Sequence, residues 1–210
     1  MRVALGRTEL KVHPLCLGGN VFGWSANAKQ SQEVLSAYES AGGNFIDTAD
    51  MYSRWHTGNI GGESETIIGD WMKARGNRSE MVIATKVAKL ATRPGLSAAN
   101  IAAAAEDSLR RLGTDYIDIY YAHHDDEKVP LEESLTAFNE LVTAGKVRCL
   151  AASNYSAARL EEALKISRDL GMSEYLLLQP NYNAIVRNEY EGDLMAVAVK
   201  EDMPVLPYFS

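Results

Sequence analysis

The chain has 210 residues, of which 46% are hydrophobic and 23% are charged, and its formal net charge is −7. This composition is typical of one ordinary globular domain and argues against a disordered chain. The acidic balance disfavours general binding to phosphate backbones or anionic lipid surfaces, because both need clustered Lys and Arg. No apolar run approaches the roughly 20 residues of a membrane span, and the N-terminus lacks the apolar core of a secretory signal. We therefore expect a single domain over residues 1–210, located in the cytoplasm, without nucleic-acid or membrane partners.

Short apolar runs rich in β-branched and aromatic residues alternate with longer helical segments along the whole chain, which is the pattern of βαβ units. A hairpin formed by residues 3–4 and 10–12 comes first. The strands that we predict after it are residues 14–17, 44–47, 81–86, 116–122, 147–152, 175–178 and 205–209. The predicted helices lie between them, the first ending near residue 42 and the others at about 64–74, 97–113, 130–145, 156–171 and 191–201.

The ends of several helices are predicted from specific residues. Ser97 and Ser156 precede helical segments as N-caps, because a serine oxygen accepts a hydrogen bond from a free backbone N–H of the first turn. Pro130 is tolerated in the first turn of a helix. Gly113 and Gly171 mark C-terminal ends.

Seven strands and six helices in alternation fit either an open doubly wound sheet or a closed (β/α)8 barrel. The turn at residues 18–23 has two adjacent glycines and a third four positions on, so it lacks the GxGxxG spacing of a dinucleotide-binding turn. No glycine-rich turn runs into Gly-Lys-Ser or Gly-Lys-Thr, which argues against a P-loop. The barrel is therefore the leading interpretation.

Functional groups of a parallel barrel gather at the carboxyl ends of its strands, and polar residues stand at those ends in this sequence. The polar or aromatic residues at, or just after, successive strand ends are Asp47, Tyr52, Lys86, His123, Ser153, Asn154, Gln179 and Tyr208. One site could use all of them.

Four of these residues suggest proton transfer to a carbonyl group. Lys86 ends an apolar strand, where an unpaired buried ammonium would lose its proton or cost several kcal/mol, so Asp47 on the neighbouring strand is its natural counterion. A free phenol has a pKa of about 10 and is a weak acid near neutrality. We expect the Lys86 ammonium to lower the pKa of Tyr52 and make it a proton donor. His123 could donate a hydrogen bond to the carbonyl oxygen.

The chain contains two cysteines, Cys16 and Cys149, and both lie in apolar strand-like runs. A small buried thiol is favoured for each over a disulfide or a metal ligand. Because no HxxxH, CxxC or carboxylate cluster recurs, no metal site is expected.

Residues 45–52, Phe-Ile-Asp-Thr-Ala-Asp-Met-Tyr, closely resemble the second-strand motif of aldo-keto reductases. Further resemblances follow in order along the chain. Residues 62–65 with 68–69 resemble the second-helix start of the family, 83–86 its third-strand lysine motif, 109–118 its third helix and fourth strand, 145–148 with 152–155 its fifth-strand segment, and 178–183 its sixth. One tetrapeptide would be weak, but ordered matches at six consecutive strand ends identify the chain as a member of this family.

The resemblance implies a reductase of aldehydes or ketones that takes its hydride from NADPH, built as a (β/α)8 TIM barrel with an N-terminal β-hairpin. By position it makes Tyr52 the general acid, Lys86 and Asp47 its electrostatic support, and His123 the group that orients the carbonyl. The residues that it implies for cofactor binding are Asp47, Ser153, Asn154, Gln179, Tyr208 and Ser210. Of these, Tyr208 would stack on the nicotinamide ring and Ser210 would begin the pyrophosphate-binding loop. The expected partner is a small carbonyl compound, and the one protein partner considered is a further copy of the chain.

Seven predicted strands fall short of the eight strand–helix units and about 250 residues of a complete barrel. The family would supply a seventh helix, an eighth strand and helix, and the basic segment that grips the adenosine phosphate after Ser210. We therefore expect the chain to be a C-terminally incomplete barrel, derived from a truncated gene product, a processed chain or a partial record.

Several residues near the predicted site have two interpretations. Trp24 and Trp55 follow the first two barrel strands and could contact substrate or simply pack. His56 could line a substrate pocket or lie exposed in a loop. His124 and Asp125 are expected to be solvated loop residues.

Two other functions compete with the reductase. A Schiff-base lyase would use Lys86 as its nucleophile, but a nearby Asp47 would keep that amine protonated, whereas the reaction needs it neutral. The other alternative is a catalytically weak, cofactor-binding regulatory subunit, which the complete set of four polar residues disfavours.

Overall fold

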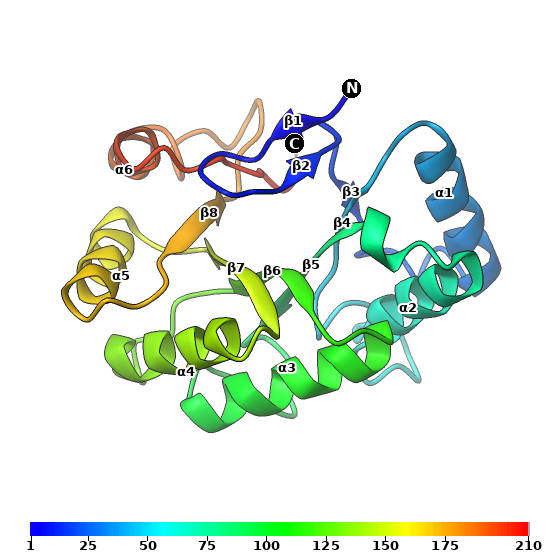
Figure 1. Cartoon of the computed structure of the whole chain (residues 1–210), viewed down its shortest axis with the longest axis horizontal. Helices are drawn as coiled ribbons and strands as arrows, with labels where there is room; N and C mark the ends of the chain where they lie inside the picture. Colours follow the sequence, from blue (N-terminus) through cyan, green and yellow to red (C-terminus); the bar gives the residue numbers. More distant parts are fainter. Residues whose placement is uncertain (210) are drawn as a thin grey trace.

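In the computed structural model, which describes residues 1–209, six parallel strands lie side by side in chain order and curl into an open half-barrel (Figure 1). The strands are β3 (Leu17–Gly18), β4 (Phe45–Asp47), β5 (Val82–Val87), β6 (Ile117–Ala122), β7 (Val147–Ser153) and β8 (Tyr175–Gln179). A separate antiparallel hairpin of β1 (Val3–Ala4) and β2 (Lys11–Val12) precedes them. The predicted incomplete barrel with an N-terminal hairpin is confirmed.

The helices lie outside the curled sheet (Figure 1). They are α1 (Ala28–Ser40), α2 (Glu63–Arg75), α3 (Ala98–Leu112), α4 (Leu131–Thr143), α5 (Ala157–Asp169) and α6 (Asp193–Lys200). The predicted caps are confirmed: Ser97 Oγ accepts from the backbone N–H of Asn100, and Ser156 Oγ accepts from that of Arg159. Gly113 ends α3 with a φ of 65°, a left-handed conformation that glycine adopts at little cost.

The apolar core has two layers, one on each face of the sheet. Between the sheet and the helices lie side chains such as Leu35, Ile68 and Leu135, all fully buried. Inside the curl, apolar residues of β4 to β8 pack against Leu10 and Val12 of the N-terminal hairpin segment. The hairpin therefore fills the barrel interior from one end, and the polar residues occupy the other.

The last predicted strand, residues 205–209, is only partly formed. Val205 and Tyr208 make isolated parallel bridges to Leu178 and Asn181, so this segment runs beside β8 without forming a continuous ladder. Leu178 N–H donates to the Pro204 carbonyl and Leu206 N–H to the Leu178 carbonyl, but Pro180, the next residue of this pattern, has no N–H to continue the ladder. The first barrel strand is also displaced, since β3 lies at Leu17–Gly18 where residues 14–17 were predicted.

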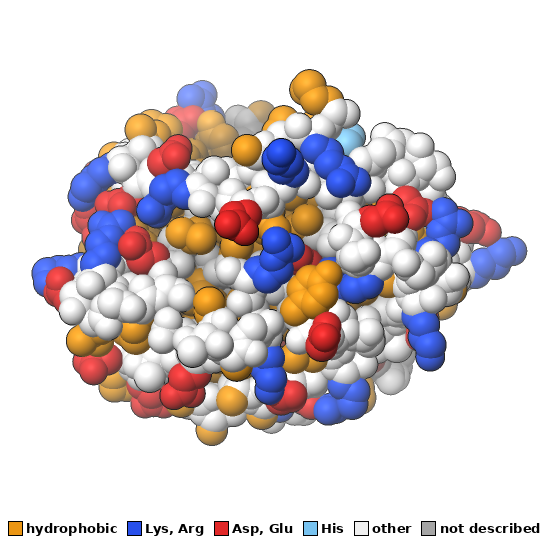
Figure 2. All heavy atoms as spheres, in the orientation of Figure 1, with side chains coloured by type: hydrophobic (Ala, Val, Ile, Leu, Met, Phe, Trp, Pro, Cys, Tyr) orange, Lys and Arg blue, Asp and Glu red, His pale blue; other side chains and the backbone are white. Residues whose placement is uncertain are grey.

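Charged side chains are mixed on the face of the molecule seen in Figure 2, where Lys and Arg alternate with Asp and Glu and form no broad patch of one sign. None of the helices within residues 1–209 is both long and apolar enough to cross a membrane. In the same range, no three His, Cys, Asp or Glu side chains come together in a way that could hold a metal ion. Cys16 and Cys149 are free thiols, and Cys149 is buried whereas Cys16 is half-buried.

Candidate active site

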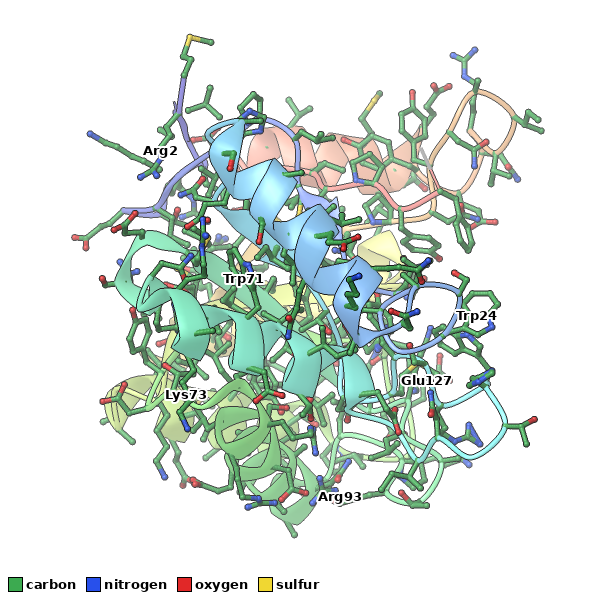
Figure 3. All side chains as sticks on the ribbon, turned by 90° about the vertical axis from the view of Figure 1, so that its right-hand side faces the viewer. Arg2, Trp24, Trp71, Lys73, Arg93 and Glu127 are labelled. Carbon is green, nitrogen blue, oxygen red and sulfur yellow. The ribbon has the colours of Figure 1, made fainter. Side chains whose placement is uncertain are left out.

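The loops that follow the strands gather on one side of the molecule. In Figure 3 Trp24 and Glu127 lie on this side, and Arg2 and Lys73 lie on the opposite side. A cavity of about 600 Å³ opens among these loops. Seven predicted site residues line it: Asp47, Tyr52, His123, Ser153, Asn154, Gln179 and Tyr208. Ser210, also predicted, lies outside the described residues.

A larger hollow of about 980 Å³ lies near the C-terminal ends of α2 and α3, with Arg78, Arg110 and Lys146 among its lining residues. These helix ends precede β5 and β6, so the hollow is at the amino end of the sheet, away from Tyr52. We therefore place the candidate site in the smaller cavity, where the polar residues converge.

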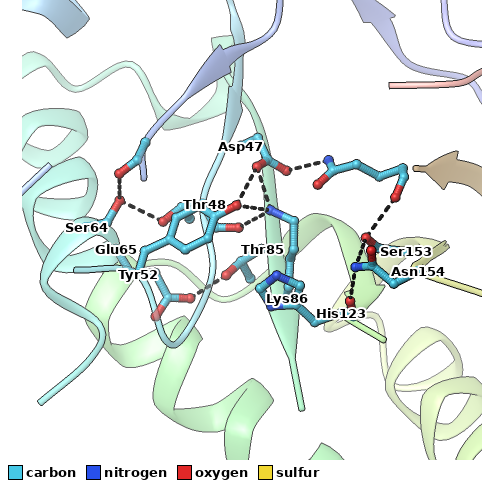
Figure 4. A network of polar contacts seen from close by, with 12 residues as sticks. Asp47, Thr48, Tyr52, Ser64, Glu65, Thr85, Lys86, His123, Ser153 and Asn154 are labelled. Carbon is cyan, nitrogen blue, oxygen red and sulfur yellow. Dashed lines mark hydrogen bonds and ion pairs between the residues drawn. The ribbon is translucent and has the colours of Figure 1, made fainter. Parts of the chain in front are cut away.

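Lys86 is the centre of the polar site (Figure 4). Its side chain is fully buried at the end of β5, and its Nζ donates to Asp47 Oδ2 at 2.5 Å, to the Thr48 carbonyl at 2.7 Å and to the Tyr52 hydroxyl at 3.0 Å. An ammonium has three donors, and all three are satisfied here. The parallel pairing of β4 with β5 explains the meeting of Asp47 and Lys86, because both strands carry their polar residue to the same edge.

The electrostatics of this centre follow from its burial. Burial favours the neutral amine of Lys86, but Asp47 and then Tyr52 outweigh it, so the pKa of Lys86 is raised and the ammonium is retained. Burial raises the pKa of the Tyr52 phenol; Lys86 lowers that pKa and Asp47 raises it, and the net direction is upward. The expectation that Lys86 lowers the pKa of Tyr52 below its ordinary value is therefore wrong, because loss of solvent outweighs the neighbouring ammonium.

His123 follows β6 directly and is buried beside Tyr52, with the two ring centroids 6.1 Å apart and the planes at 75°. Burial, and then Lys86 and Lys89, hold the pKa of His123 well below its usual range, so the imidazole is neutral. Its Nδ1 has no hydrogen-bond partner among the described residues. A neutral imidazole carries one N–H and one acceptor nitrogen, so the tautomer of His123 that is protonated at Nε2 would have an N–H to offer a ligand.

Amide and hydroxyl groups from the next strand ends form a connected shelf beside this centre. Gln179 Nε2 donates to Asp47 Oδ1 at 3.1 Å, and Ser153 Oγ donates to the Gln179 carbonyl at 2.8 Å. Asn154 Nδ2 donates to the His123 carbonyl at 2.8 Å, and the Tyr208 hydroxyl donates to Asn154 Oδ1 at 2.7 Å. The shelf therefore joins the ends of β6, β7 and β8 to the carboxylate of Asp47.

Strained backbone is concentrated around the cavity. Five non-glycine residues of the described chain have a positive φ. Asn154 and Phe209 line the cavity, Ser53 follows Tyr52, and Ala88 precedes Lys89. Such conformations cost about 1–3 kcal/mol each and persist only where the surrounding structure imposes them. Strained backbone of this kind clusters at active and ligand-binding sites, so its position supports the choice of this cavity as the candidate site.

A second polar cluster behind the site escaped the sequence analysis. Glu65 on α2 is fully buried, and it accepts from Thr85 Oγ1 at 2.5 Å and from Arg111 Nε at 2.6 Å. Asp50 is also buried, neither of its carboxylate oxygens has a partner among the described residues, and burial, with Glu65 next, raises its pKa to about 7. The motif containing Glu65 was visible in the sequence. Its partner Arg111 lies 46 residues away, and no local pattern links the two.

The structure resolves most of the alternatives left open for nearby loop residues. Trp55 lines the cavity and packs edge-on against Trp24, with ring centroids 5.6 Å apart and 45% of each side chain exposed. His56 is exposed and lies outside this cavity. Asp125 is not a free solvated residue, because Arg159 Nε donates to it at 2.8 Å. His124 is half-buried, and its Nδ1 contacts the Asp125 carbonyl.

The residues present fit the nicotinamide end of the implied cofactor. A carboxamide needs both a donor and an acceptor, and Ser153, Asn154 and Gln179, which line the cavity, would supply them by exchanging bonds of the shelf described above. Tyr208 adds an aromatic ring to the same cavity. Those four residues would hold the nicotinamide, beside Tyr52 and His123.

A sequence model described as the Aldo/keto reductase family matches residues 14–210. The chain is 34% identical to norsolorinic acid reductase B of Dothistroma septosporum, over 95% of this chain and 53% of that protein. It is 33% identical to aryl-alcohol dehydrogenase [NADP(+)] of Phanerodontia chrysosporium, over 94% of this chain and 51% of that protein. It is 36% identical to a protein described as a voltage-gated potassium channel subunit beta of Schizosaccharomyces pombe, over 91% and 56% respectively. The chain thus spans about half the length of the curated relatives that it matches.

Proposed function

The chain belongs to the aldo/keto reductase family, and from this premise we propose that it reduces an aldehyde or ketone to an alcohol with hydride from NADPH. The observation that carries the proposal is the contact of one buried ammonium, Lys86 Nζ, with both the Asp47 carboxylate and the Tyr52 hydroxyl. The Lys86 ammonium favours the phenolate that remains when Tyr52 gives up its proton, against the opposing effect of burial on the Tyr52 pKa. The similarity to the aryl-alcohol dehydrogenase [NADP(+)] of Phanerodontia chrysosporium supports NADP as the cofactor.

Tyr52 is the proton donor in this mechanism. When bound, the nicotinamide supplies a hydride to the carbonyl carbon, and negative charge develops on the carbonyl oxygen. Tyr52 then transfers its phenolic proton to that oxygen, and the Lys86 ammonium 3.0 Å from the phenolic oxygen stabilises the phenolate. The raised pKa of Tyr52 keeps the phenol protonated before the reaction.

Asp47 and His123 support this transfer in different ways. Asp47 keeps Lys86 charged in a buried position, where an unpaired ammonium would tend to lose its proton. The neutral His123 donates a hydrogen bond to the carbonyl oxygen and fixes its orientation toward Tyr52. These roles require that Lys86 is charged and that His123 is neutral.

Deuterium transfer tests the reaction class. NADPH that carries deuterium at both C4 positions of the nicotinamide is incubated with the chain and an aromatic aldehyde, and the alcohol is analysed by mass spectrometry. We expect one deuterium on the former carbonyl carbon. Alcohol without deuterium, or no alcohol at all, would reject the proposed hydride transfer.

The lyase alternative requires Lys86 as a neutral amine, and the raised pKa of Lys86 opposes it. Borohydride added with a carbonyl substrate would leave a covalent adduct on Lys86 if a Schiff base formed, and we expect no adduct.

The regulatory-subunit alternative draws support from the relative described as a potassium channel subunit. It predicts NADPH binding without turnover, which the same deuterium experiment distinguishes from reduction.

A further inference from the structure

Two charged side chains line the cavity, Asp47 and Lys89. Asp47 is neutralised by Lys86 and also accepts from Gln179. Lys89 makes no hydrogen bond or ion pair with any residue among positions 1–209, and the neutral His123 carries no charge to oppose it. The cavity therefore presents one uncompensated positive charge.

Lys89 is an exposed residue at the cavity wall, and it differs from several surface lysines that pair with carboxylates. Lys146 pairs with Glu106, Lys165 pairs with Asp169, and Lys200 pairs with Glu161. Among residues 1–209, no carboxylate pairs with Lys89. A cation left without an internal partner at the wall of a cavity is suited to an anion that arrives from outside.

The backbone holds Lys89 in place. Ala88, immediately before it, is buried and has a φ of 112°, which a residue with a Cβ rarely adopts. The Ala88 carbonyl accepts from the Gly95 N–H at 2.9 Å, so the loop after β5 closes on this point. The strained backbone residue therefore lies immediately before Lys89.

The electrostatic environment and the shape of the cavity agree with an anionic ligand. Burial and then the Lys86 ammonium lower the pKa of Lys89, and an anion bound beside it would oppose both effects by favouring the charged amine. Trp55, with Trp24 against its edge, contributes an exposed aromatic surface to the same cavity. Aromatic faces of this kind bind flat, apolar ring systems.

We propose that Lys89 binds an anionic group, such as a carboxylate, on the carbonyl substrate, whose aromatic part packs against Trp55. The natural substrates are then aromatic aldehydes or ketones that carry a negative charge. This inference rests on the proposed function, because the ligand is a substrate only if the chain reduces carbonyl compounds. The binding that it predicts can be measured without turnover.

Tryptophan fluorescence titrations with 4-formylbenzoate and its methyl ester test the proposal, because the two compounds have the same ring and aldehyde and differ in charge. The wild-type chain should bind the acid at least about fivefold more tightly than the ester. Lys89→Met should remove this preference, and Lys89→Arg should keep it. Lys128→Met, which removes an exposed lysine outside the cavity, is the matched control and should also keep it.

Equal affinity of the wild type for acid and ester would overturn the proposal, and so would a preference that survives in Lys89→Met. A Lys89→Met variant that loses NADPH affinity while retaining its preference for the acid would assign Lys89 to a cofactor phosphate instead. Turnover of the ester is measured separately with deuterated NADPH. Failure of that reaction would reject the reductase proposal and leave the binding result to decide this one.

Discussion

Asp47 holds the polar site together because its two carboxylate oxygens bind different partners. Oδ2 accepts from Lys86 at 2.5 Å and from the Tyr52 hydroxyl at 3.3 Å, and Oδ1 accepts from Gln179 at 3.1 Å. A single side chain on β4 thus connects Tyr52, the proposed proton donor, to the shelf that would hold the cofactor.

Asp47→Asn should destabilise the protein, because it leaves the fully buried Lys86 without its counterion. Removing one partner of a buried ion pair costs about 3–5 kcal/mol, and we expect the free energy of unfolding in urea to fall by that order at pH 7. Asp70→Asn, an exposed position on α2, is the control. A loss below about 1 kcal/mol in Asp47→Asn would mean that Lys86 is neutral or paired elsewhere.

Asp50 should make stability depend on pH. Its pKa is raised from 3.8 to about 7, first by burial and then by Glu65. Below pH 3.8 the carboxyl is neutral in both the folded and unfolded states. Between 3.8 and about 7 the unfolded chain loses this proton first, so the folded state loses stability as pH rises, by about 4 kcal/mol in total.

Asp50→Asn should therefore be more stable than the wild type at pH 8, with an advantage that is small at pH 4. Urea denaturation at the two pH values measures the difference, and Asp70→Asn again serves as the exposed control. The same advantage at both pH values would show that Asp50 does not titrate in this range.

At the scale of elements, α2 and α3 approach each other closely at Gly69. A Cβ placed on Gly69 would lie 2.4 Å from the Arg111 carbonyl oxygen and 2.8 Å from the Leu112 carbonyl carbon. These are backbone atoms, so they cannot turn aside as a flexible side chain would. The close approach also brings Arg111 to the buried Glu65.

Gly69→Ala should destabilise the protein by about 1–3 kcal/mol, although alanine has the higher helix propensity. Thermal or urea unfolding measures the change, and Asp70→Ala on the same helix should alter stability by no more than about 0.5 kcal/mol. A stabilised Gly69→Ala variant would show that the two helices pack less closely than the structure indicates.

The elements were predictable where local chemistry determines them and less so where distant contacts do. Alternating apolar runs and the serine caps at Ser97 and Ser156 located the strands and helices, and the order of polar strand ends located the residues that line the cavity. The Glu65–Arg111 pair depends on how two helices cross. The upward direction of the Tyr52 pKa depends on burial from several elements, which a sequence motif does not reveal.

At the scale of the whole molecule, the curled sheet converts a linear series of strand ends into one site. β4, β5 and β6 bring Asp47, Lys86 and His123 to the same edge, and β7 and β8 add the shelf of hydroxyl and amide groups. The N-terminal hairpin segment fills the opposite end with apolar side chains.

The central claim is that Tyr52 is the proton donor of a carbonyl reductase, and Tyr52→Phe tests it most directly. The measurement is NADPH oxidation with an aromatic aldehyde by the wild type, by Tyr52→Phe and by the control Tyr182→Phe, whose hydroxyl bonds to Glu191 away from the cavity. General acid catalysis contributes about 100- to 10,000-fold, so kcat should fall by at least about 100-fold in Tyr52→Phe, with NADPH affinity and Tyr182→Phe unchanged. A Tyr52→Phe variant that retains half of the wild-type kcat would contradict the account.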